Sequence, residues 1–300
     1  MTQHKVGWLK LALQVQASIF PEIFPRIVLC SGFALLISLI HYYGFSLQGN
    51  IFGSITSNVA YNLVLGLLLV FRTNTAYDRY WEGRKTWGSI VINILNLGRK
   101  IQQAVTVNEN EAINAESKSE IIQLLSAFAI ATKLHLRTEP ANNQLKYFLT
   151  ESQFSEIQHV KNMPITIVLW IGDLLKKQQV SNHLSMDEFN SMNSLLDNMV
   201  EAVMGCERIA KTPMPLAYAV YLKLLLLTYC LFLPLQLIND LNWWTVLIVA
   251  LISFILLGIE EIGNQIEDPF GHDENDLPLD MICKSVIENV EELINQDDIS

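Results

Sequence analysis

The sequence predicts an all-α integral membrane protein with four transmembrane helices and a cytosolic helical domain. Two long stretches carry no Asp, Glu, Lys or Arg: one runs from Ile27 to Phe71, and the other from Leu241 to Ile259. A soluble helix needs a charged face toward water, so about 18 or more uncharged, mostly apolar residues indicate a membrane span. The hydrophobic fraction of 51% agrees, because so much apolar sequence cannot be hidden inside a small soluble core.

The elements follow in order along the chain. An amphipathic helix is expected over 6–24, and the first two spans over about 26–43 and 51–71. The third span is expected over about 214–238, broken by the proline at position 234, and the fourth over about 243–263. The predicted segments are the amphipathic helix with spans one and two, the cytosolic helical domain, spans three and four, and an acidic cytosolic tail: residues 1–72, 73–212, 213–264 and 265–300.

The distribution of positive charge predicts the orientation. The turns at 44–50 and 239–242 contain no Lys or Arg, whereas both residue types occur at the N-terminus and directly after Phe71. Lys and Arg collect on the cytoplasmic side of membrane proteins. Both termini and the helical domain are therefore expected in the cytoplasm.

Composition and motifs exclude several functions. The net charge of −10 argues against nucleic acid as a partner. The four cysteines form no close pairs, so the sequence indicates neither a disulfide framework nor a zinc site. No nucleophile elbow, phosphate-binding loop or zinc motif occurs, and we expect no catalytic residues and no enzyme activity.

The second span carries two rows of residues at helical spacing. Apolar residues recur every four positions from Ile55 to Phe71. Beside them runs a row of small and polar residues, which are either pore-lining or contacts between helices: Ser54, Asn58, Asn62 and Gly66. Four helices of about 10 Å diameter pack into a solid bundle, so an ion path requires several chains.

The residues that follow this span resemble the signature of the bestrophin family, in particular its bacterial and chloroplast members. The longest match is Phe71-Arg72-Thr73-Asn74-Thr75-Ala76-Tyr77-Asp78-Arg79-Tyr80-Trp81-Glu82-Gly83-Arg84. Further matches stand in the family's order, at 17–20, 205–208, 212–218, 267–271 and 275–279. The resemblance covers essentially the whole chain.

The resemblance implies a homo-pentamer in a lipid bilayer, either the bacterial cytoplasmic membrane or a thylakoid membrane. It implies a central pore that passively conducts small anions, with chloride and bicarbonate as the candidates, through a hydrophobic neck at Leu63, Leu67 and Phe71. A narrow apolar neck can gate by shedding water. The alternatives are a homologue that conducts Na⁺ and K⁺ and, further off, a secondary transporter, although the two pairs of spans show no repeat symmetry.

The resemblance also implies a calcium site just beyond the fourth span, although we expect no cofactor to be required. Its candidate ligands match the calcium clasp of animal bestrophins: Gln265, Asp268, Asp273 and Asp276. Oxygen ligands of this kind suit Ca²⁺. The alternative is a solvated acidic cap near the membrane surface, and the spacing does not fit an EF-hand loop.

Overall fold

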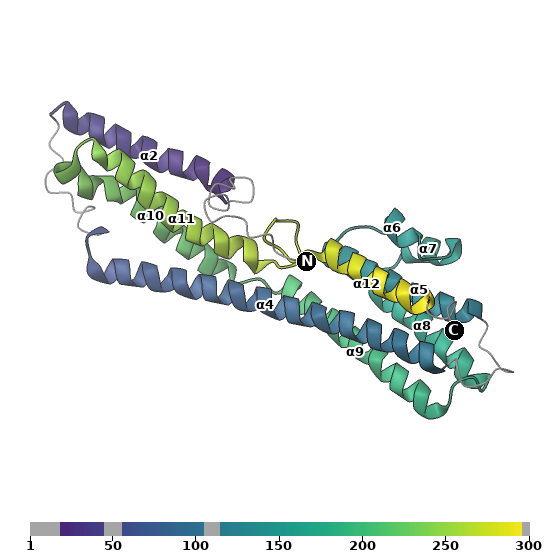
Figure 1. The fold of residues 1–300 in the computed structure, drawn as a ribbon. Helices are drawn as coiled ribbons and strands as arrows, with labels where there is room; N and C mark the ends of the chain where they lie inside the picture. The colour runs from purple at the N-terminus through teal and green to yellow at the C-terminus, as the bar shows by residue number, and fades with distance from the viewer. Residues whose placement is uncertain (1–18, 45–55, 105–114, 296–300) are drawn as a thin grey trace. The chain divides into compact units, whose positions relative to one another are not determined.

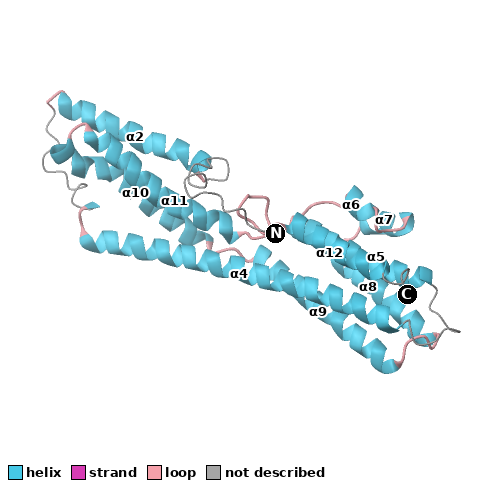
Figure 2. Cartoon of the chain, in the orientation of Figure 1, coloured by secondary structure: helices cyan, strands magenta, loops and turns pink. Residues whose placement is uncertain are grey.

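The computed structural model describes residues 19–44, 56–104 and 115–295 (Figure 1). Every regular element in these residues is a helix (Figure 2). The described residues form two compact units. The first contains residues up to Tyr80, Pro213–Asp268 and Asp273–Asn275; the second contains Trp81–Thr212, Pro269–His272 and residues from Asp276 onward.

Among the described residues, four helices are long and apolar enough to cross a membrane, as the sequence predicts. They are α2 (Phe20–Tyr42), α4 (Val59–Ala104), α10 (Leu216–Leu241) and α11 (Trp244–Glu267). α4 supplies its first part to the first unit and its remainder to the second. It does not end at Phe71, because the polar residues that follow still favour a helix once one face is buried.

The first membrane helix begins earlier than the sequence suggested. α2 starts at Phe20, and residues 6–18 of the expected amphipathic helix lie outside the described residues. Pro21 occupies the first turn, where a backbone N–H has no partner within the helix, so it favours a helix start. Pro25 lies inside α2 and removes one backbone hydrogen bond without ending the helix.

The expected break at Pro234 is wrong. α10 continues through this proline to Leu241. Pro234 is buried, and its neighbours Cys230 and Leu233 pack against α2 and α11. Packing against adjacent helices allows a membrane helix to tolerate the one hydrogen bond that proline removes. The chain then turns at Asn242, whose φ of 48° lies in the left-handed region that asparagine adopts more readily than most residues.

Small side chains bring the membrane helices together. α2 packs along α10 and α11. The buried cluster at their centre contains Cys30, Ala34, Cys230, Leu233 and Val249. A second cluster joins α4 to α10 through two leucines from each helix. Close backbone approach strengthens van der Waals contact, which drives helix association in lipid.

The second unit is built around α5 (Ala115–Leu136), in which every residue from Leu124 to Leu134 is buried. α8 (Met163–Val180) and α12 (Leu279–Asn295) pack on it, and α9 (Met186–Lys211) packs on α8. The shorter α6 (Asn143–Lys146) and α7 (Glu151–Ile157) lie between α5 and α8 in the sequence.

Local signals set the ends of these helices. Ser185 and Glu188 form a capping box at the start of α9, and Thr150 and Gln153 form another at α7. α12 shows that the acidic tail is more than a solvated segment, because Cys283 and Val290 are buried in this unit.

Candidate functional site

The candidate neck residues lie on one side of α4 in the membrane unit. Leu63, Leu67 and Phe71 expose 70%, 51% and 54% of their surface. On the buried side of the same helix, Leu65 and Leu69 pack against α10. The described helices therefore leave this apolar ridge (Leu63, Leu67 and Phe71) at least half exposed, and its role in a neck stays a prediction.

Helix geometry fixes the dimensions of the apolar ridge. A rise of 1.5 Å per residue puts successive side chains roughly 6 Å apart along the axis, and Leu63 roughly 12 Å from Phe71. The ridge has no hydrogen-bonding group to offer an ion. Brought close to its symmetry mates, it would form a narrow apolar tube about two helical turns long.

The polar row beside the ridge is not a continuous helical stripe. Ser54 lies outside the described residues. Asn58 precedes α4, and its side-chain oxygen accepts hydrogen bonds from the backbone N–H groups of Ala60 and Tyr61 at 2.8 and 3.3 Å. Asn62 donates to the Thr56 carbonyl at 2.9 Å. Both amides satisfy the backbone at the start of the helix, where asparagine is a preferred cap, so their assignment as pore-lining residues stays a prediction.

An ion pair anchors α4 directly after the ridge. The buried Arg72 guanidinium lies 2.6 Å from the Glu267 carboxylate at the end of α11. Glu267 also accepts a hydrogen bond from the Met214 backbone N–H at 2.7 Å. Its backbone carbonyl accepts one from the Arg79 side chain at 3.1 Å. Because Arg72 adjoins Phe71, this pair limits rotation of α4 about its axis and so sets the direction of the ridge.

Sequence reasoning placed Arg72 in the family motif but did not identify its partner. The available signal was position: Arg72 directly follows one uncharged stretch, and Glu267 lies just beyond the predicted fourth span. Charges that flank two spans at the same membrane depth are natural partners.

The third predicted span, which follows Pro213, begins as a helix near its expected position, since α10 starts at Leu216. The backbone N–H of Met214, just before α10, already donates a hydrogen bond to the Glu267 carboxylate.

The candidate calcium ligands lie at the end of α11 and in the residues that follow it. Gln265 donates to Glu22 at 3.0 Å and accepts from Asn275 at 2.7 Å. Gln265, Asp268 and Asp273 belong to the first unit and Asp276 to the second. Within residues 19–44, 56–104 and 115–295, no three His, Cys, Asp or Glu side chains form a group suited to a metal ion. The calcium site therefore stays a prediction.

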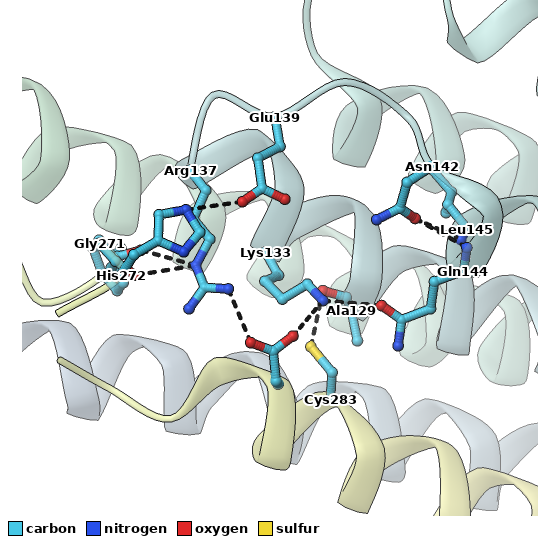
Figure 3. A network of polar contacts seen from close by, with 12 residues as sticks. Ala129, Lys133, Arg137, Glu139, Asn142, Gln144, Leu145, Gly271, His272 and Cys283 are labelled. Carbon is cyan, nitrogen blue, oxygen red and sulfur yellow. Dashed lines mark hydrogen bonds and ion pairs between the residues drawn. The ribbon is translucent and has the colours of Figure 1, made fainter. Parts of the chain in front are cut away.

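A polar network in the second unit binds the 269–272 segment and α12 to α5. The buried Lys133 donates to Asp280 at 2.7 Å and to Gln144 at 2.9 Å (Figure 3). Arg137 donates to the carbonyl of Gly271 at 3.1 Å and to Asp280 at 3.0 Å. Hydrogen bonding to Lys133, followed by Arg137, holds the pKa of Asp280 below its usual range. The network is structural, because its charges are paired within the unit.

A second buried charge joins three elements of the same unit. Glu207 on α9 accepts a hydrogen bond from Asn162 at 2.8 Å and pairs with His135 on α5 at 2.8 Å. It also pairs with Lys211 one turn along α9. Burial alone would raise the pKa of Glu207, but the contacts with Lys211 and His135 outweigh it and lower the pKa.

The chain is similar in sequence to known proteins along almost its whole length. Three relatives are named voltage-dependent anion channel-forming proteins. One from a Nostoc species is 46% identical and covers 98% of this chain and 94% of its own length. One from a Synechocystis species is 44% identical and covers 96% and 92%. The third, YneE from Escherichia coli, is 30% identical and covers 93% and 89%.

Solved structures agree with the fold. The crystal structure of a bacterial bestrophin homologue from Klebsiella pneumoniae matches with a TM-score of 0.83 at 26% identity, covering 91% of this chain and 98% of that chain. A family model described as bacterial/fungal bestrophin protein matches residues 1–292. This chain is therefore a membrane protein, not an enzyme, and it belongs to the bacterial and fungal bestrophin family.

Proposed function

We propose that several copies of this chain, five by the family resemblance, surround a central pore that passively conducts small anions. The names of the relatives support anion conduction. Chloride and bicarbonate are the expected permeant ions.

The apolar ridge of α4 is the observation on which the proposal depends. Leu63, Leu67 and Phe71 are each at least half exposed, although they lie in a helix whose opposite side is buried against α10. Apolar side chains that the described part of the chain leaves this exposed would meet lipid, another copy or a pore. The four-residue spacing favours the pore, because it stacks three apolar rings along one axis.

The proposed gate works by dewetting. An apolar tube roughly 12 Å long offers water few hydrogen bonds, so water leaves it, and an ion cannot enter without its hydration shell. Small changes in ring diameter then switch conduction. Arg72 acts as a positioning residue, since its ion pair with Glu267 at the end of α11 holds α4 in place directly after Phe71.

Conductance in planar bilayers tests the neck. We expect the triple variant Leu63→Ala, Leu67→Ala and Phe71→Ala to increase the open probability or leak of the reconstituted protein, because wider rings retain water. The matched control is Val64→Ala with Val70→Ala, two residues of α4 that are also about half exposed, at 50% and 53%. Currents unchanged in the triple variant, or raised equally in the control, would refute the neck assignment.

Reversal potentials test the ion. In a tenfold KCl gradient, an ideally selective pore reverses near 59 mV in magnitude for one elementary charge, with opposite signs for chloride and potassium. We expect the chloride sign. The potassium sign would favour the cation-conducting alternative, to which the net charge of −10 contributes attraction. A mass in mild detergent of one or two copies would contradict the enclosed pore.

We also propose that both termini and the second unit lie in the cytoplasm, from the distribution of Lys and Arg. A reporter domain that is active only in the cytoplasm should be active when it is fused to either terminus, and one that is active only outside the cytoplasm should be inactive there. A reporter inserted at 44–50 should show the opposite behaviour.

A further inference from the structure

A cavity of about 210 Å³ lies within the membrane unit, at the meeting of α2, α10 and α11. Its lining combines two cations with an otherwise apolar or thiol wall. The cations are Arg26 of α2 and Lys223 of α10. Neither belongs to the proposed neck, and charged side chains within membrane helices usually mark a function.

The two cations lie at one depth in the membrane unit. Arg26 is six residues after the start of α2, Lys223 seven after the start of α10, and Glu260 seven before the end of α11. At 1.5 Å per residue each lies roughly 10 Å inside its helix. This depth suits long basic side chains whose charged ends reach toward the head groups while their stems stay in hydrocarbon.

The acidic partners of these cations are buried beneath them. Arg26 lies 2.8 Å from Glu261 and 3.5 Å from Glu260, and Lys223 lies 3.7 Å from Glu260. Both glutamates are almost fully buried, whereas the side chains of Arg26 and Lys223 are 48% and 51% exposed. The cavity therefore presents positive charge at its surface, with N–H donors left over for a further acceptor.

The apolar wall lies deeper than the cations. Leu29 and Cys30 follow Arg26 by about one helical turn, and Leu227 follows Lys223 by one turn. Leu257 precedes Glu260 on α11, which runs in the opposite direction, so it also lies deeper. The order from the membrane surface inward is thus cationic and then apolar, which is the order of a phospholipid's phosphate and acyl chain.

We propose that this cavity binds one phospholipid with an anionic head group. The phosphate of the lipid contacts Arg26 and Lys223, and one of its acyl chains enters the cavity. The volume is too small for a whole lipid, so the rest of the molecule lies along the outer face of the helices. Basic pockets between membrane helices on the cytoplasmic side suit such lipids. The apolar wall selects a lipid over free phosphate. The inference is independent of whether the pore conducts anions.

Native mass spectrometry tests the site on the assembled, delipidated protein. The probes are dioleoyl phosphatidylglycerol and dioleoyl phosphatidylcholine, which share acyl chains and differ in net charge. We expect phosphatidylglycerol to be retained preferentially. Lys223→Gln, whose partner Glu260 keeps Arg26, should lower that preference about fivefold, the contribution of one basic residue near an anionic lipid.

A variant that fills the cavity separates this site from general charge attraction. Leu227→Trp should abolish the preferential binding, whereas Leu251→Trp, at an exposed leucine of α11 outside the cavity lining, should not. Size-exclusion profiles confirm assembly of each variant. Equal retention of both lipids, unchanged binding in Leu227→Trp, or displacement of the lipid by millimolar inorganic phosphate would each overturn the proposal.

Discussion

Gly83 provides a sharp test of how two distant sequence motifs pack together. It lies in the motif at the middle of α4, and the Pro269-Phe270-Gly271 motif packs directly on it. A Cβ atom at position 83 would lie 2.8 Å from Cγ of Pro269 and 3.2 Å from Cζ of Phe270. Real Cβ atoms do not approach other atoms this closely, so Gly83→Ala forces the proline ring or the helix to move.

The same helix offers a matched control. At Gly88, one and a half turns further along α4, an added Cβ would meet nothing within 4 Å. Replacing glycine by alanine inside a helix gains about 1 kcal/mol in propensity, and Gly88→Ala should keep most of this gain. At Gly83 the same gain is opposed by an overpacking cost of about 1–3 kcal/mol. The two variants should therefore differ by about 1–3 kcal/mol, with Gly83→Ala the less stable.

Thermal unfolding in one detergent measures the difference. For a unit of this size each kcal/mol shifts the midpoint by about 2–4 °C, so Gly83→Ala should unfold roughly 2–12 °C below Gly88→Ala. Trp87, which packs against Phe270 with 6.5 Å between ring centroids, reports locally through its fluorescence. If Gly83→Ala unfolds at or above the temperature of Gly88→Ala, the close contact with Pro269 is wrong.

Three further predictions concern the second unit. Glu207→Gln should lower unfolding free energy by about 2 kcal/mol in chemical denaturation, because the neutral amide loses charge-assisted hydrogen bonds to Asn162 and His135; an unchanged midpoint would contradict this. The contacts that lower the pKa of Asp280 stabilise the folded protein at pH values above the ordinary pKa of 3.8, and this stabilisation is lost as the pH falls through the lowered pKa. Asp280→Asn should therefore flatten the acid side of a curve of stability against pH. Burial raises the pKa of the Cys206 thiol to about 12, so maleimide at pH 8 should label it only after unfolding, as mass spectrometry can show.

Much of the fold follows from the sequence alone. The two uncharged stretches predicted three of the membrane helices, because lipid excludes charge regardless of how the helices later pack, and the apolar run around Lys223 predicted the remaining one. The ends of the helices were harder to predict, because a proline can either start a helix or lie inside one. Pro21 starts a helix, whereas Pro234 sits inside one that its neighbours support.

The candidate site was predictable only in part. The four-residue spacing of Leu63, Leu67 and Phe71 can be read directly from the sequence, and the structure adds that the described residues leave each of them at least half exposed. Spacing did not reveal that Asn58 caps the start of α4, because a cap is defined by hydrogen bonds to the backbone, and the role of the polar row in a pore stays a prediction.

The sequence by itself determined the membrane class, the family motifs and the position of the apolar ridge, since these depend on composition and on spacing along one helix. Only the tertiary structure decided which charges meet: Arg72 with Glu267, and Arg26 and Lys223 above Glu260 and Glu261. The physical reason is that a buried charge requires a partner within a few ångströms, and that partner lies on another helix, far along the chain.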